Sequence, residues 1–88
     1  MNGYAVTFRD SAAKSIRKLP RDLQRRVTAA AEGLSQNPRP AGSVKQTGYR
    51  DLHRIRVGDW RIVYVIDDAS RTVDVRIVAH RREVYRDL

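Results

Sequence analysis

The sequence predicts an α+β fold in which two helices pack against a mostly antiparallel sheet. Apolar residues recur at helical spacing in the first half of the chain and alternate singly in the second half. A segment rich in proline and glycine, residues 37–43, separates the halves. Two apolar runs then flank Gly58-Asp59, a dipeptide typical of a two-residue hairpin turn. Because 88 residues suffice for one domain and not for two, we expect residues 1–88 to form a single domain.

The first half of the chain predicts a strand followed by a helical hairpin. Large apolar or aromatic side chains alternate with smaller or polar ones, as in a strand: Tyr4, Val6 and Phe8 against Ala5, Thr7 and Arg9. Asp10 and Ser11 then offer a helix N-cap. Pro20 ends the first helix and suits the first turn of the second, so we expect the two helices to form a hairpin. The apolar positions expected to face the core are Ala12, Ala13, Ile16 and Leu19 in the first helix and Leu23, Val27, Ala30, Ala31 and Leu34 in the second.

The second half predicts a three-stranded antiparallel meander, with a turn at residues 67–71 between the second and third strands. Because glycine comes first in Gly58-Asp59, we expect a type II′ turn there. Residues 81–86 at the end of the chain fit a short helix. The three strands are expected at residues 52–57, 60–66 and 72–78.

The chain is strongly basic. Lysine and arginine total 18 against 10 acidic residues, which gives a net charge of +8 and a pI near 10.8. Such a field attracts polyanions, so we expect nucleic acid, an acidic protein or both as partners. No cysteine is present and two histidines are too few for a metal cluster, so no metal or other cofactor is expected. No apolar run reaches the roughly 20 residues that span a bilayer, and residues 1–10 lack a signal-peptide pattern, so we expect a cytoplasmic protein without a membrane partner.

The expected hairpin places three arginines on one face of the sheet. With a two-residue turn, Arg56 lies opposite Arg61 and Arg54 joins them, whereas His53 falls on the face beneath the helices. Like charges at this spacing repel and destabilise the pair. Two interpretations follow: the arginines bind a phosphate, or they extend into solvent, where salt screens the repulsion.

The hairpin segment from Leu52 to Tyr64, LHRIRVGDWRIVY, resembles the signature of the RelE/ParE toxin superfamily. The resemblance covers nearly the whole chain and implies a RelE-like fold of the microbial ribonuclease type. It also implies a toxin of a type II toxin–antitoxin pair in the bacterial cytoplasm. The other segments that agree with the family are Phe8, Ala12, Leu19 and Pro20, then Val44, Lys45 and Gly48, and finally His80 to Tyr85.

For RelE-type members, the resemblance implies an endoribonuclease that enters the ribosomal A site and cuts messenger RNA without a metal. The RNA's own 2′-hydroxyl attacks the adjacent phosphate and leaves a 2′,3′-cyclic phosphate and a 5′-hydroxyl. In such an enzyme Arg61 clamps the scissile phosphate, Arg81 stabilises or protonates the leaving oxygen, and Tyr85 stacks on or orients a base. The catalytic positions carried over are Arg54, Arg56, Arg61, Arg81 and Tyr85, and we further expect RNA contacts from Lys45, Arg50, His80 and Arg82.

The sequence departs from the best-known RelE pattern, which has lysines where Arg54 and Arg56 stand. A lysine can lose its proton near neutral pH, whereas an arginine effectively cannot. We therefore expect Arg54 and Arg56 to stabilise charge on the phosphorane, and removal of the 2′-proton falls to ribosomal RNA, water, His53 or His80. The basic residues of the two helices either bind ribosomal RNA or face solvent: Lys14, Arg17, Lys18, Arg25 and Arg26.

Other functions stay open within this resemblance. ParE-like relatives share the fold and inhibit DNA gyrase without nuclease activity, but they generally lack the basic cluster with its tyrosine, which favours the ribonuclease. A nucleic-acid-binding module without chemistry, and a copy that binds its antitoxin but no longer cuts, are the remaining alternatives. For every toxin, the resemblance implies a RelB-like antitoxin, an acidic and partly disordered protein that covers the basic surface.

Overall fold

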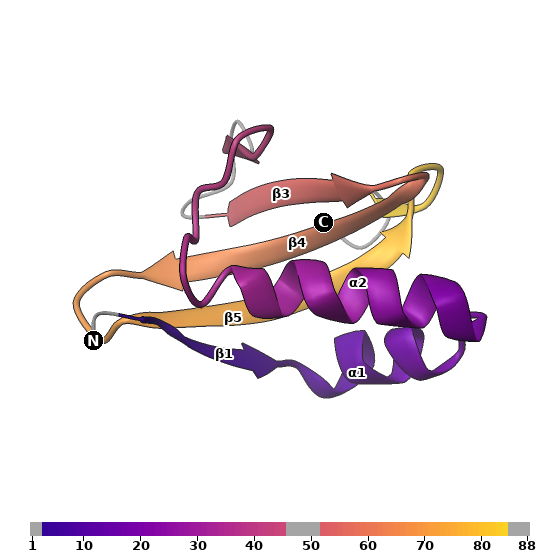
Figure 1. Cartoon of the computed structure of the whole chain (residues 1–88), viewed down its shortest axis with the longest axis horizontal. Coiled ribbons are helices and arrows are strands. Elements are labelled where there is room, and N and C mark those ends of the chain that lie inside the picture. The colour runs from indigo at the N-terminus through magenta and orange to yellow at the C-terminus, as the bar shows by residue number, and fades with distance from the viewer. Residues whose placement is uncertain (1–2, 46–51, 85–88) are drawn as a thin grey trace.

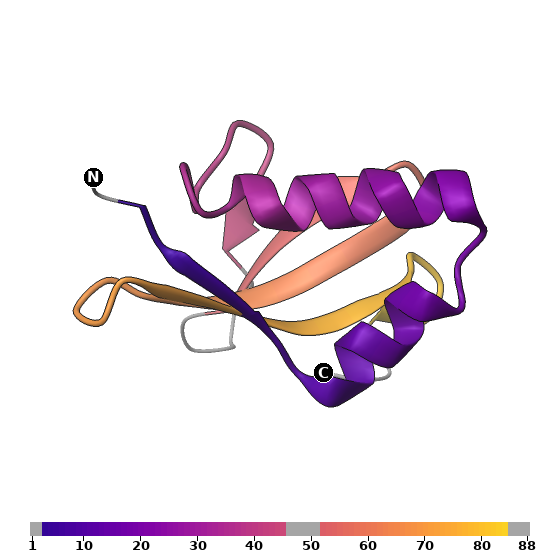
Figure 2. The same cartoon turned by 60° about the horizontal axis from the view of Figure 1, so that its bottom comes forward.

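The computed structural model describes residues 3–45 and 52–84. Within these residues, five strands form one sheet in the order β1-β5-β4-β3-β2 (Figure 1). Helix α2 crosses in front of the sheet in Figure 1, and Figure 2 shows α1 following β1 at the edge of β5. The elements are β1 (Ala5–Phe8), α1 (Asp10–Arg17), α2 (Arg21–Gly33), β2 (Val44–Lys45), β3 (Leu52–Val57), β4 (Trp60–Asp67) and β5 (Thr72–His80).

The predicted α+β class, with a first strand, a helical hairpin and a meander, is confirmed. The sheet is mixed, because β1 pairs parallel with β5 while the other three pairings are antiparallel. The sequence pattern did not predict β2, which pairs Val44 with Arg54 and Lys45 with His53. Two residues are too few to show an alternating period, so only pairing with β3 defines this strand.

The predicted N-cap at Asp10 or Ser11 is wrong. Helix α1 begins at Asp10 itself, and Arg9 is the N-cap residue without a side-chain hydrogen bond. The physical reason is that Arg9 is still tied to the sheet, since its N–H donates to the carbonyl oxygen of Val75 at 2.8 Å. Asp10 instead places its charge in the first turn, where the helix dipole favours it. Pro20 is also an N-cap residue, one position before the first turn of α2.

The main core lies between the helices and one face of the sheet. The predicted stripe of α2 is buried at Val27, Ala31 and Leu34, and it meets a sheet face that includes Ile62 and Tyr64. The opposite face of the sheet carries a smaller apolar cluster of Val63, Ala79 and Val84. Val84 is 1% exposed, so the segment after β5 folds back onto this second face, which we call the open face. Neither helix has the length and apolar composition needed to cross a bilayer.

Candidate functional site

The three hairpin arginines line a hollow on the open face. Strands β3 and β4 pair in the predicted register, with Arg56 opposite Arg61 and Arg54 opposite Val63. Gly58 has a φ of 58° and Asp59 is not in the left-handed region, as a type II′ turn requires. The hollow has a volume of about 350 Å³ and is lined by Gly42, Val44, Arg54, Ile55, Arg56 and Arg61. We call it the arginine hollow.

Arg61 is held in place by the hairpin turn. Its Nη1 donates to the carbonyl oxygens of Gly58, at 3.0 Å, and Trp60, at 3.1 Å. A guanidinium has five N–H donors, and both of these bonds come from one nitrogen. Toward the described residues Nε and Nη2 make no hydrogen bond, so both remain for a ligand. Arg56, across the strand pair, is exposed.

Arg81 lies at the same turn. Its backbone N–H donates to the carbonyl oxygen of Asp59 at 2.7 Å, and its side-chain Nε lies 3.8 Å from Asp59 Oδ1. The Arg81 side chain is 55% exposed, so this long ion pair leaves most of it accessible. Arg26, on α2, also lies close to the turn. Its Nη2 is 3.6 Å from the position that a Cβ atom would occupy if residue 58 were not glycine. The β3–β4 turn thus brings Arg26, Arg61 and Arg81 together.

The two histidines lie on the helix-covered side of the sheet. His53 stacks on Tyr64 with ring centroids 5.7 Å apart. His80 meets Trp60 edge-on at 5.7 Å, and its Nδ1 accepts a hydrogen bond from the backbone N–H of Arg82 at 3.2 Å. The structure therefore does not bring either histidine together with the arginine hollow.

The remaining predicted residues are placed as follows. Lys45 is exposed on β2, opposite His53, and Arg82 is exposed in the turn after β5. Arg50 and Tyr85 lie outside the described residues, and so does the end of the predicted C-terminal helix from residue 85 onward. The described part of that segment, residues 81–84, forms a turn. The basic residues predicted on the helix surfaces, Lys14, Arg17, Lys18, Arg25 and Arg26, are all exposed.

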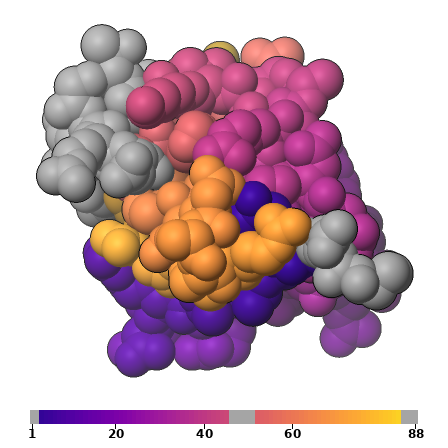
Figure 3. Space-filling view, turned by 90° about the vertical axis from the view of Figure 1, so that its left-hand side faces the viewer, coloured from indigo at the N-terminus to yellow at the C-terminus, as the bar shows by residue number. Residues whose placement is uncertain are grey.

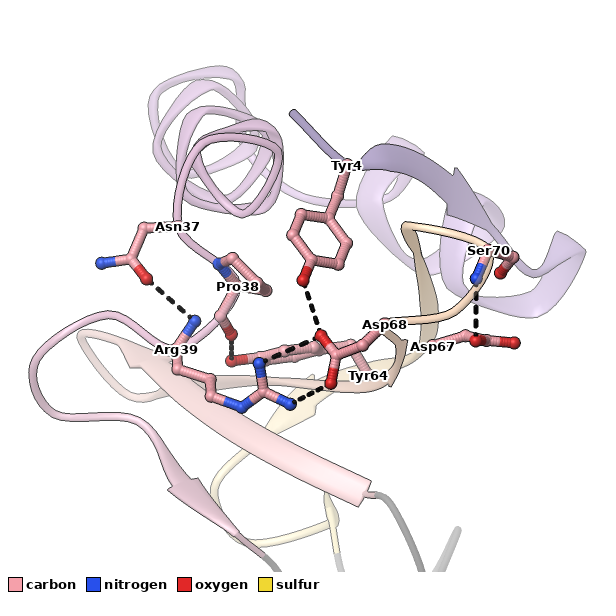
Figure 4. Close-up of polar contacts among 8 residues, drawn as sticks. All are labelled: Tyr4, Asn37, Pro38, Arg39, Tyr64, Asp67, Asp68 and Ser70. Atoms are coloured by element: carbon pink, nitrogen blue, oxygen red, sulfur yellow. Dashed lines mark hydrogen bonds and ion pairs between the residues drawn. The ribbon is translucent and has the colours of Figure 1, made fainter. Parts of the chain in front are cut away.

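A polar clasp, which we define as Tyr4, Arg39, Tyr64 and Asp68, lies at the far end of β4 (Figure 4). Asp68 Oδ1 accepts from Tyr4 Oη at 2.6 Å, and both of its oxygens accept from Arg39, at 3.3 and 2.9 Å. The hydrogen bonds from Arg39 and then Tyr4 lower the pKa of Asp68 to about 2. Figure 3 shows the orange β4–β5 turn seated between β1 and the loop that leads to β2.

Tyr64 holds the loop that leads to β2 through a second contact. Its side chain is fully buried and its hydroxyl donates to the carbonyl oxygen of Pro38 at 2.7 Å. Burial raises the pKa of Tyr64 to about 12, so the phenol stays protonated as a donor. The loop continues to Gly42 and Val44 in the wall of the arginine hollow. The sequence analysis missed the clasp, because its hydrogen bonds join residues 26 to 64 positions apart and leave no local pattern.

Comparison with known protein families assigns the chain to a family. Residues 6–85 match the model of the ParE toxin of the type II toxin–antitoxin system, parDE. The chain belongs to the RelE/ParE toxin superfamily. It is 32% identical over 84 residues to the toxin RelE of Mycobacterium tuberculosis, covering 94% of this chain and 87% of the relative. The toxin RelG of the same organism is 33% identical over 84 residues, covering 94% and 97%.

A solved structure of this superfamily has the same fold. The archaeal RelE–RelB complex from Pyrococcus horikoshii contains a chain that aligns with a TM-score of 0.80 and 26% identity, covering 92% of this chain and 97% of that one. The protein is therefore a toxin of the RelE type. The predicted superfamily and fold are both confirmed.

Proposed function

We propose that this RelE-type toxin is an endoribonuclease that cuts messenger RNA in the ribosomal A site without a metal. The observation that supports the proposal is the arginine hollow, where Arg54, Arg56 and Arg61 surround one open space. Arg56 faces Arg61 across the strands, an arrangement that costs stability unless an anion lies between them. Guanidinium groups match the paired oxygens of a phosphate, so the scissile phosphodiester is the ligand that fits.

The proposed reaction needs positive charge more than it needs a nucleophile from the protein. The RNA 2′-oxygen forms a bond to phosphorus while the bond from phosphorus to the 5′-oxygen breaks. Negative charge builds on the phosphorane oxygens and then on the leaving oxygen. We assign the phosphate to Arg61, the phosphorane charge to Arg54 and Arg56, and the 5′-oxygen to Arg81. Tyr85 is assigned to the neighbouring base, as the resemblance implies.

The proton acceptor for the 2′-hydroxyl is proposed to come from outside this set. Arginine cannot serve as a base, and His53 and His80 lie on the helix-covered side of the sheet. Water or ribosomal RNA is left as the acceptor, which supports a reaction that depends on the ribosome. Lys45, Arg50, His80 and Arg82 are proposed as contacts to the surrounding RNA.

An acidic antitoxin is the proposed protein partner. The structure from Pyrococcus horikoshii is of a RelE–RelB complex, and the present chain carries a net charge of +8. An acidic, RelB-like chain that covers the arginine hollow would match this charge and exclude RNA. The proposal places toxin, antitoxin and ribosome together in the bacterial cytoplasm.

Inhibition of DNA gyrase is the second candidate function. The family model that matches residues 6–85 is that of the ParE toxin, and the fold is common to both kinds of toxin. The arginine hollow favours cleavage of RNA, because a gyrase inhibitor without nuclease activity has no need to gather repelling cations around one space.

The deciding experiment is cleavage on stalled translation complexes, with 5′ ends mapped by primer extension. We expect wild-type protein to cut in the A-site codon and Arg61→Ala to cut about 100- to 1000-fold more slowly, as when one preorganised charge stabiliser is removed. Arg21→Ala, an exposed arginine outside the hollow, is the matched control and should cut normally. Absence of cuts by folded wild-type protein would contradict the proposal, and a gyrase supercoiling assay would then test the ParE-like function.

A further inference from the structure

A groove runs along the part of β5 that β1 leaves uncovered. Strand β1 pairs only with Thr72–Val75, and in the described part of the chain no other strand pairs with β5 on that side. Helix α1 packs beside this edge (Figure 2). Two hollows of about 370 and 300 Å³ lie there, and they adjoin each other because both are lined by Ser15 and Val78. We call the two together the β5-edge groove. The eight residues of α1 give it a length of about 12 Å.

One end of the β5-edge groove is basic. Arg9 and Arg76 line it together with the hydroxyl-bearing Ser11 and Ser15. Arg76 is oriented by Asp74, whose Oδ2 accepts from Arg76 Nε at 2.5 Å. Only Nε is used in this pair, so both terminal nitrogens of Arg76 remain as donors.

Asp74 is itself held in place. Its Oδ1 accepts a hydrogen bond from Thr7 Oγ1 at 3.1 Å, so β1 positions the carboxylate that positions Arg76. A guanidinium fixed in this way loses little side-chain entropy when it binds a phosphate.

The other end of the groove carries the aromatic residues. Trp60 and His80 meet edge-on, and Lys18 and Glu83 lie in the same wall. Trp60 is half-buried, so part of its indole is open to the groove. Cations that contact a backbone, followed by an aromatic face that takes a base, are how proteins bind single-stranded nucleic acid.

We propose that the β5-edge groove binds a single strand of RNA at a site separate from the arginine hollow. Arg9 and Arg76 contact its phosphates, and a base stacks against Trp60 and His80. Neighbouring side chains of a strand point to opposite faces, so Trp60 and Arg61 serve two different sites. This inference goes beyond the cleavage reaction and does not depend on it. The aromatic end favours RNA over an acidic peptide, which would use the cations and leave the indole face unoccupied.

Trp60 gives a direct test, because it is the only tryptophan in the chain. We would titrate the full-length protein with a short oligoadenylate and follow Trp60 fluorescence at several salt concentrations. Stacking predicts saturable quenching. Arg9→Ala with Arg76→Ala should weaken binding about tenfold or more, which corresponds to the loss of charge-assisted hydrogen bonds. The slope of log affinity against log salt should fall by about 0.7 for each phosphate that the variant no longer neutralises.

Control variants separate this site from the arginine hollow. Arg21→Ala, at an exposed position in the first turn of α2 and outside the groove wall, should leave the quenching and the salt slope unchanged. Arg54→Gln with Arg56→Gln should slow messenger cleavage but preserve the quenching, so failure of one proposal is distinguishable from failure of the other. If the double variant at Arg9 and Arg76 does not fold, Arg9→Ala alone gives the same test, because Arg9 is exposed.

Three results would overturn the proposal. The first is no quenching by oligoadenylate, and the second is quenching that is insensitive to Arg9 and Arg76. The third is tighter binding of a polyglutamate peptide than of oligoadenylate in the same groove, which would assign it to an acidic protein partner.

Discussion

The polar clasp and the arginine hollow lie at opposite ends of β4 and use arginine in opposite ways. At the clasp, Arg39 meets both oxygens of Asp68, and Tyr4 donates to the same carboxylate. At the hollow, Arg56 lies opposite Arg61, and none of the six described residues that line the space is acidic. Arg39 therefore supports the fold through a carboxylate of its own chain. Arg56 and Arg61 repel each other, and an anion from outside the chain would balance them.

The two ends are also connected. The loop that Arg39 and Tyr64 hold in place continues to Gly42 and Val44, which form a wall of the arginine hollow. The paired charges at one end thus help to maintain the position of Arg56 opposite Arg61 at the other. Substitutions at the clasp should therefore lower the free energy of unfolding, whereas removal of an arginine at the hollow should raise it.

Replacing Tyr64 should give the largest effect. Its side chain is fully buried in the main core, so Tyr64→Ala should lower the free energy of unfolding by about 3–5 kcal/mol. Tyr64→Phe keeps the ring and leaves the Pro38 carbonyl without its donor, which should cost about 1–3 kcal/mol. Urea denaturation followed by circular dichroism measures both. A Tyr64→Phe variant as stable as wild type would mean that water replaces the hydroxyl and that this hydrogen bond does not hold the loop.

Removing a cation at the arginine hollow should stabilise the fold but slow the cleavage of RNA. Arg56→Thr ends the repulsion with Arg61, so the free energy of unfolding should rise by up to about 1 kcal/mol. Cleavage in the A site should fall at least about tenfold, as removal of one charged hydrogen bond to phosphate predicts. Lys45→Thr, an exposed strand residue opposite His53, is the control and should not stabilise. Lower stability in Arg56→Thr would show that the arginines do not strain the hairpin.

The smallest effect is expected for Asp68, whose contribution to stability should be lost in acid. Hydrogen bonds from Arg39 and Tyr4 lower the pKa of Asp68 from 3.8 to about 2. A carboxyl whose pKa is lowered by folding contributes stability above its unfolded value, and this contribution is lost as pH falls through the folded value. Wild type and Asp68→Asn should therefore differ in melting temperature above pH 4 and converge toward pH 2. Because Asp68 is exposed, added salt should shrink the difference. A difference that is constant over this range would exclude the carboxylate as its source.

Local sequence patterns determined most of what places the candidate site. The stripe from Leu23 to Leu34 predicted the buried face of α2, and Gly58-Asp59 predicted the register that sets Arg56 opposite Arg61. These features are readable from the chain because helix and strand periods and turn chemistry act over a few residues. The start of α1 was predicted wrongly because a hydrogen bond from Arg9 to the distant Val75 overrides the local capping signal.

Only the tertiary structure decided which distant residues meet. The clasp joins β1, the loop before β2 and the β4–β5 turn, while the β5-edge groove depends on where β1 stops pairing. The sequence did not predict on which face of the sheet His80 lies. In the structure it packs against Trp60, away from the arginine hollow. Such contacts depend on how whole elements pack, and packing joins residues that no short-range period relates. The sequence by itself therefore determined the arginine hairpin, and the tertiary structure decided what surrounds it.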